Sequence, residues 1–261
     1  MAASDPASAA AEIEGAVEQQ RALLASRGTE AYRTPVLPDE PLTLFVEKDC
    51  EVLPEEADLK ELVDRLTAIS DRGMALSDEL LDCMVTAQST HICKLFVTEN
   101  RDLAQSYVYS EGTAIAVSSR DGHTQTGYEG VSGLCGPEIF RELEEKMKAS
   151  VAMALELLDA DHIEPGEYEI ITSPEVSGLI AHEAFGHGVE MDMFVKNRAL
   201  GKEYIGKRVG SDLVTMHEGA LCAEDVTSYA FDDEGTPAGD VTEIENGILK
   251  TGICDALSAM R

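Results

Sequence analysis

Two histidines and a glutamate lie close together in the segment His182–His187, which reads HEAFGH. The nitrogen of a neutral imidazole is a preferred ligand of zinc. Two histidines on one helix also lower the entropy cost of assembling a site. A carboxylate next to a ligand can take a proton from a water molecule that the metal has acidified. The segment therefore has the residue types of a hydrolytic zinc site.

The spacing of these two histidines is unusual. His182 and His187 are five positions apart, which is about 140° around an α-helix, whereas the four-residue spacing of H-E-x-x-H gives about 40°. Both rings can reach one metal ion only if the helix is distorted between them, by a wide turn or an early end. Gly186 and Gly188 permit such a distortion. The alternative is a pair of helix-end histidines hydrogen-bonded in a polar core, with Glu183 solvated.

Two acidic residues follow the motif. Glu190 lies eight positions beyond His182, about 80° around a helix, so it could bind the metal or orient a ligand histidine from outside the coordination sphere. Asp192 has the same orienting option. The alternative is an ordinary acidic helix end.

Other metal-binding residue types occur without such spacing. His91 and Cys93 share one face of a predicted strand, but two ligands alone bind a metal weakly, and packing is the better interpretation. His217, Cys222 and Cys254 fall in strand-like sequence and are expected to be core or surface residues rather than ligands. The sequence has no G-x-S-x-G nucleophile motif, Walker phosphate loop or dinucleotide fingerprint.

Apolar periodicity and turn residues predict the elements that position these groups. Helices are expected over 6–27, 55–72, 137–158 and 174–192. Strands are expected over 42–46 and 167–172, as a meander over 79–130, and as short strands after 211. The meander is expected to turn at Glu99-Asn100, Glu111-Gly112 and Asp121-Gly122, and the late strands at Glu234-Gly235 and Asn246-Gly247. The glycine-rich segment 127–133 is interpreted as a connection.

Strands followed by a helix on one face predict an α+β fold. An N-terminal antiparallel sheet with long helices comes first, followed by the start of a mostly β domain that carries the metal-site helix. The expected division is 1–41 (helix and linker), 42–160 (α+β domain) and 161–261 (catalytic domain). The last boundary lies in the polar segment 159–166.

Composition limits the partners. The chain has 261 residues with 20 basic and 50 acidic side chains, so its formal charge is −30. Nucleic acids and anionic membranes require a basic surface, so both are excluded as partners. Salt adaptation and a generic acidic surface explain the charge equally well. Six dispersed cysteines without a C-x-x-C pair, and no secretory signal, predict reduced thiols in a cytoplasmic protein.

The segment IAHEAFGHGVEMD resembles the metal-site helix of the TldD/PmbA family of metallopeptidases. Three later segments match that family in the same order: FDDEGTP (231–237), IENGILK (244–250) and DALSA (255–259). The resemblance is strong over 166–261 and weakens toward the N-terminus. It implies a TldD-type subunit in which His182 and His187 bind zinc and Glu183 is the general base.

The resemblance also implies function and partners. Such proteins hydrolyse unfolded or small peptides, and they work as homodimers or as heterodimers with a PmbA-type subunit. Family members continue past the position of Arg261, and their third ligand is a cysteine there; nothing in this sequence matches it. The alternative is therefore a non-catalytic or partner-dependent assembly subunit.

Overall fold

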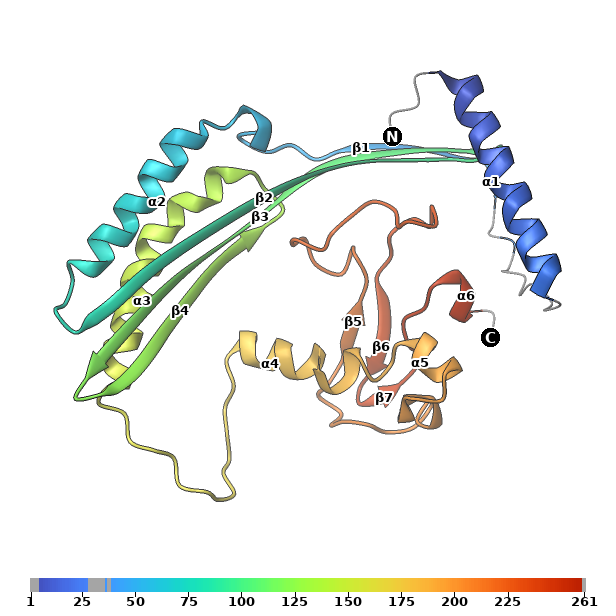
Figure 1. Cartoon of the computed structure of the whole chain (residues 1–261). Helices are drawn as coiled ribbons and strands as arrows, with labels where there is room; N and C mark the ends of the chain where they lie inside the picture. The colour runs from blue at the N-terminus through green and yellow to red at the C-terminus, as the bar shows by residue number, and fades with distance from the viewer. Residues whose placement is uncertain (1–4, 28–35, 37–38, 260–261) are drawn as a thin grey trace. The chain divides into compact units, whose positions relative to one another are not determined.

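The first part of the structure is built on two long strands, β2 (Leu80–Val97) and β3 (Arg101–Arg120), which pair in antiparallel register (Figure 1). The structure is a computed structural model that describes residues 5–27, 36 and 39–259. On the other side of β3, β1 (Leu42–Glu47) pairs with its first part in parallel, and β4 (His123–Gly133) pairs with its second part in antiparallel. The predicted antiparallel sheet is therefore present, with one parallel strand added.

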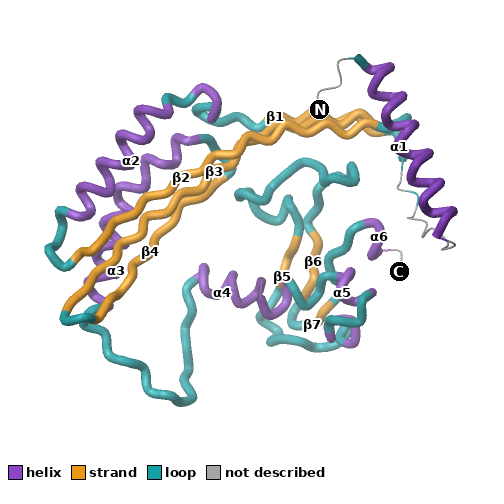
Figure 2. The backbone as a smooth tube through the Cα atoms, viewed as in Figure 1, coloured by secondary structure: helices purple, strands orange, loops and turns teal. Residues whose placement is uncertain are grey.

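The face that β3 buries changes along the strand. In the first part of β3 the odd-numbered residues Leu103, Gln105 and Tyr107 are buried. From Val108 onward, even-numbered residues such as Ala114 are buried instead. Because side chains alternate across a strand, the sheet packs against different partners on its two faces. The long tubes of Figure 2 show how far these strands extend.

Two helices cover the second half of the sheet, as Figure 1 shows. They are α2 (Leu59–Met74) and α3 (Leu143–Leu157), each preceded by a short 3₁₀ helix, η1 (Pro54–Glu56) and η2 (Pro137–Glu142). The core between helices and sheet is apolar and contains Ile69, Leu80, Cys83, Ala114, Ala116, Val131, Phe140, Leu143, Met147, Val151 and Ala154. The α2 helix begins four residues later than predicted because Asp58 caps it, accepting from the backbone of Lys60 and Glu61.

Three glycine-based predictions in this part are wrong. Glu111-Gly112 is not a turn but lies inside β3, where a Cβ on Gly112 would be 3.0 Å from Leu143 of α3. Gly127 lies in strand β4 rather than a connection, and a Cβ there would be 1.9 Å from the Ser150 carbonyl oxygen. The helix predicted to end at residue 72, before Gly73, continues through this glycine to Met74, and Met147 of α3 packs 2.9 Å from the Gly73 Cβ position. These glycines permit close packing rather than chain reversal.

The second part begins after an extended segment. Residues 159–173 contain neither helix nor strand, so the strand predicted over 167–172 is absent, and nearly all of these residues are exposed. Short elements follow: α4 (Pro174–Ala181), a π-helical turn (His182–Gly186), α5 (Met191–Val195), η4 (Leu200–Glu203), β5 (Met216–Glu218), β6 (Val241–Glu245), β7 (Ile248–Leu249) and α6 (Ala256–Ala259). The strands form one sheet in the order β5-β6-β7. The α+β class is thereby confirmed.

The turns at Asp121-Gly122, Gly235 and Asn246-Gly247 are found as predicted, all with positive φ. The helix α1 (Pro6–Arg27) is also found, with the Asp5 carboxylate accepting from the backbone of Ala7 and Ser8. Residues 34, 35, 37 and 38 of the predicted linker lie outside the described residues, as does Gly28, the residue after the helix predicted over 6–27.

Contacts divide the chain between Val36 and Leu37, with α1 in one unit and residues 39–259 in the other. The predicted boundary over 159–166 therefore stays a prediction. Among the helices that the structure describes, none has both the length and the apolar character needed to cross a membrane.

Candidate metal site

The metal motif lies where a regular helix changes its hydrogen bonding. Ser173 caps α4 by accepting from the backbone of Val176, and Pro174 occupies the first turn. After Ala181 the chain becomes π-helical over His182–Gly186, and the backbone N–H of His187 donates to the His182 carbonyl at 3.2 Å. The helix predicted over 174–192 therefore ends early, and α5 is a separate helix.

This widened turn brings the two histidine rings together. A five-residue hydrogen bond replaces the usual four-residue one, so residues five positions apart fall on the same side of the helix. The ring centroids of His182 and His187 are 4.6 Å apart at an interplanar angle of 73°. The distortion that the spacing requires is thus present. A nitrogen from each ring and a carboxylate oxygen of Glu183 all lie within 4.8 Å of one another, and the three side chains are exposed.

Glu190 is the acidic residue that contacts the motif. Its carboxylate is 2.8 Å from Nδ1 of His187, whose pKa it raises above the ordinary value by accepting the hydrogen bond. A parallel bridge to Ile253 holds the Glu190 backbone in place. Asp192 instead forms an ion pair with Lys196 one helical turn later.

Apolar residues of the motif anchor it from the inside. Val189 is 2% exposed and forms a small core with Ile244 and Leu249, against which Phe185 also packs. The motif therefore directs its apolar side chains toward the β5-β6-β7 sheet and its polar side chains toward solvent.

The donor set fits a zinc ion, because two imidazoles and a carboxylate are typical zinc ligands and lie close enough to share one ion. Of the other residues considered from the sequence, none joins this cluster within the described chain. His217 instead bonds Asp240 at 2.8 Å, and Cys222 and Cys254 are exposed free thiols.

A recess of about 630 Å³ lies beside His187. Its lining is mostly apolar but includes Arg198 and Arg208, of which Arg208 forms an ion pair with Asp212. Sequence reasoning did not single out Arg198 or Arg208 as candidate site residues. Basic residues are few in this chain, 20 in all, so two arginines only ten positions apart were the feature of the sequence that could have indicated them.

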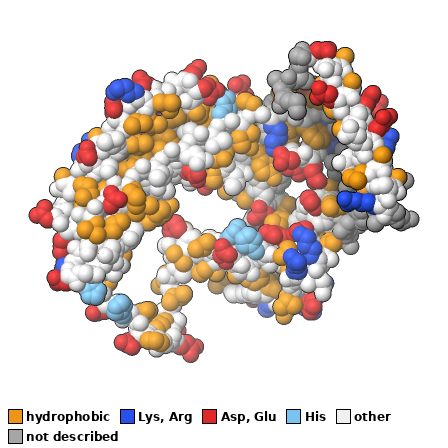
Figure 3. Space-filling model, viewed as in Figure 1, with side chains coloured by type: hydrophobic (Ala, Val, Ile, Leu, Met, Phe, Trp, Pro, Cys, Tyr) orange, Lys and Arg blue, Asp and Glu red, His pale blue; other side chains and the backbone are white. Residues whose placement is uncertain are grey.

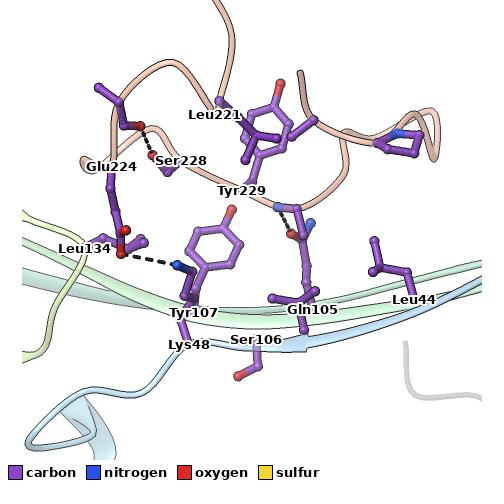
Figure 4. A pocket seen from close by; sticks show the side chains of 16 residues that line it. Leu44, Lys48, Gln105, Ser106, Tyr107, Leu134, Leu221, Glu224, Ser228 and Tyr229 are labelled. Carbon is purple, nitrogen blue, oxygen red and sulfur yellow. Dashed lines mark hydrogen bonds and ion pairs between the residues drawn. The ribbon is translucent and has the colours of Figure 1, made fainter. Parts of the chain in front are cut away.

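A second pocket, of about 410 Å³, separates the first half of β3 from the segment 220–238 (Figure 4). The Gln105 amide crosses this junction by accepting from the Ala230 backbone and donating to the Phe231 carbonyl, both at 2.8 Å. Lys48 and Glu224 form an ion pair at its rim. Tyr107 and Tyr229 line it, and burial raises the pKa of both phenols. This pocket lies between β3 and the segment 220–238 that leads to β6, and no residue of the metal motif lines it.

The segment that carries this site is similar to known proteins. Residues 165–261 match the model of the PmbA/TldA metallopeptidase C-terminal domain. A metalloprotease of Methanocaldococcus jannaschii is 36% identical over 135 residues, and a zinc metalloprotease TldD homolog of Saccharolobus solfataricus is 38% identical over 91 residues. These similarities relate the C-terminal part of the chain to the TldD/PmbA metallopeptidases.

The TldD/PmbA fold extends over nearly the whole chain. The crystal structure of TldE from Thermococcus kodakarensis superposes with a TM-score of 0.64 and 16% identity, covering 92% of this chain and 54% of that one. The two sequence matches cover 52% and 34% of this chain. They cover 30% and 20% of the relatives, so the chain matches only part of the length of each.

Proposed function

We propose that this chain is a zinc peptidase subunit that hydrolyses unfolded or small peptides. His182 and His187 are the metal ligands, and Glu183 is the general base. The observation that carries the proposal is the π-helical turn, which brings two imidazoles and a carboxylate within 4.8 Å of one another at an exposed surface. The naming of the Saccharolobus solfataricus relative as a zinc metalloprotease supports the choice of metal.

A bound zinc would polarise the scissile carbonyl and acidify the attacking water. The chain's own residues supply the proton transfer and the orientation of the ligand histidine. Glu183 accepts the proton of that water and returns it to the leaving amine. Glu190 holds the His187 ring through Nδ1, so that Nε2 faces away from it and is free to bind the metal. The recess beside His187 is large enough for a side chain of the substrate.

The proposal includes a partner. A catalytic zinc takes three protein ligands and keeps one position open. With Glu183 acting as the base, two histidines remain as ligands among the described residues. We therefore propose that the third ligand comes from outside the described residues. The complete enzyme would be a homodimer or a heterodimer with a PmbA-type subunit, a pairing that the similarity to TldE supports.

A peptide-cleavage assay tests this function. A quenched-fluorescent unstructured peptide is incubated with the zinc-loaded chain, alone and with a PmbA-type subunit. Glu183→Gln should lower the cleavage rate by about 10²–10⁴-fold, the usual contribution of general acid–base catalysis. Glu203→Gln, an exposed glutamate of η4, is the control and should cleave normally. Equal cleavage rates for Glu183→Gln and the unsubstituted chain would show that Glu183 is not the general base. No cleavage under any condition would contradict the peptidase proposal and favour the alternative of a non-catalytic assembly subunit.

A further inference from the structure

Four polar side chains meet on the sheet face that carries α2 and α3, apart from the metal motif. Cys93 of β2 and Ser106 of β3 lie directly opposite each other in the antiparallel register. His91 is two residues before Cys93, so its side chain is on the same face. Glu55, in the 3₁₀ helix η1, reaches this face from above the sheet.

The distances among these side chains give an ordered chain of hydrogen bonds. The Glu55 carboxylate is 2.8 Å from Nδ1 of His91. Nε2 of the same ring is 2.9 Å from the Ser106 hydroxyl and 3.4 Å from the Cys93 sulfur. A carboxylate only accepts hydrogen bonds, so Nδ1 of His91 is the donor to Glu55. In the tautomer that carries its proton on Nδ1, Nε2 is the atom that can accept a proton. This is the arrangement of nucleophile, base and orienting carboxylate that activates a thiol or a hydroxyl.

Access favours the thiol over the hydroxyl. Cys93 is exposed, whereas Ser106 is half-buried. An open groove of about 560 Å³ begins at Cys93, and Phe45 and Leu95 give it apolar walls. Phe45 is 65% exposed and Leu95 77%, so an incoming apolar group can reach both. Thiol–disulfide exchange needs a thiol, a base and access to the sulfur, and all three are present here.

We propose that Cys93 is a reactive thiol, assisted by His91 and Glu55, that exchanges with small disulfides carrying an apolar group. The Cys93 sulfur attacks one sulfur of the disulfide, and its proton passes to Nε2 of His91. The sulfur–sulfur bond of the reagent breaks as the mixed disulfide forms. The second sulfur leaves as a thiolate and takes the bonding electron pair. The small disulfide is thus the oxidant, and the product is a chain modified at Cys93.

The other cysteines are internal references for a test. Cys222 and Cys254 are exposed like Cys93, but their sulfurs form no hydrogen bond to a histidine within the described chain. The full chain is treated with dithiodipyridine, a neutral aromatic disulfide, at pH 7, and labelling is followed by peptide mass spectrometry. Cys93 should be labelled at least about 10-fold faster than Cys222 and Cys254. Equal rates at the three positions would overturn the proposal.

Two substitutions test whether His91 and Glu55 cause the difference. His91→Gln should bring the Cys93 rate down to that of Cys222, and Glu55→Gln should lower it severalfold. Glu56→Gln, the adjacent exposed glutamate of η1, should leave it unchanged. The buried Cys83 reports on folding, since it stays unlabelled while the core is intact. If Cys83 becomes labelled in His91→Gln, that variant has lost its core packing, and Glu55→Gln becomes the test. A Cys93 labelling rate that Glu55→Gln leaves unchanged would then overturn the proposal.

Discussion

At the scale of single residues, the chemistry of the site depends on which atom each side chain presents. Glu190 occupies Nδ1 of His187 and so selects Nε2 as the free nitrogen. Asp192, its near neighbour in sequence, pairs with Lys196 instead. Helical angles from the sequence allowed both acids the same orienting role. These angles could not distinguish Glu190 from Asp192, because the regular helix does not continue through the motif. A bridge to Ile253 sets the position of Glu190 instead.

This difference between the two acids predicts a difference in metal affinity. Glu190→Ala should weaken zinc binding by about 10–100-fold, because outer partners that orient a ligand histidine contribute that much. Asp192→Ala should change the affinity little, since it removes only an exposed ion pair. Isothermal titration with zinc at pH 7 measures both. Equal losses in the two variants would contradict the role assigned to Glu190.

Glu243 is a second residue whose environment sets its chemistry. It lies on the central strand β6, it is 0% exposed, and neither carboxylate oxygen has a hydrogen-bond partner among the described residues. Burial, with a smaller contribution from the charge of Glu218, raises the pKa of Glu243 from 4.5 to about 7. The folded chain therefore keeps a proton on Glu243 at pH values where the unfolded chain has lost it.

This pKa predicts a loss of stability as the pH rises. Below pH 4.5 the carboxyl is protonated in both states and has no effect. Between pH 4.5 and 7 only the unfolded state ionises, so the free energy of unfolding falls with pH, by about 3 kcal/mol in all. Urea unfolding at pH 5 and pH 8 measures the difference. Glu243→Gln should remove most of it and the exposed control Glu245→Gln should not; a Glu243→Gln variant with the full pH dependence would refute the assignment.

At the scale of helices and strands, hydrophobic periodicity predicted most of the elements and failed at particular glycines. The helices α1, α2 and α3 and the turn at Asp121-Gly122 are where the sequence indicated. Gly112 and Gly127 were interpreted as chain breaks because glycine is common in turns. In the structure each gives another element room to approach, a tertiary contact that a local pattern does not encode.

The contact at Gly127 makes a strong steric prediction. Gly127→Ala would place a Cβ 1.9 Å from the backbone oxygen of Ser150 in α3, so the helix must move away from β4. We expect a loss of about 3 kcal/mol or more in the free energy of unfolding. Gly130→Ala on the same strand is the matched control, because the nearest atom would be 3.6 Å away. Similar urea midpoints for the two variants would show that α3 does not pack as described.

The two proposed sites show where a local pattern is sufficient and where it is not. The five-residue spacing indicated that a regular helix could not bring the two histidines together, and the π-helical turn is the distortion that does. Glu55, by contrast, lies 36 residues from His91. Nothing in the local spacing marks it as a partner, because the contact forms only when η1 lies over the sheet.

At the scale of the whole molecule, negative charge dominates the surface. The formal charge is −30, and Figure 3 shows acidic side chains spread over the visible face with few basic ones between them. Exposed ion pairs contribute little each, so repulsion among the excess carboxylates outweighs them. This repulsion destabilises the folded chain and is screened by salt.

Salt should therefore stabilise the protein. Raising the salt concentration from about 0.05 M to about 1 M is expected to raise the melting temperature by on the order of 5 °C, as a gain of one to two kcal/mol would. Sodium chloride and potassium chloride should act alike, because screening depends on ionic strength. Thermal unfolding followed by circular dichroism measures the effect. A melting temperature that falls with salt would mean that the ion pairs, and not the repulsion, dominate.

The central claim is that the π-helical turn presents His182 and His187 to one zinc ion, and zinc titration of the metal-free chain tests it most directly. The chain should bind about one zinc, and His182→Ala and His187→Ala should each weaken binding by more than about 100-fold, since a lost ligand costs more than a lost outer partner. His162→Ala, in the exposed segment before α4, should bind as the unsubstituted chain does. Unchanged zinc affinity in both motif variants would contradict the account.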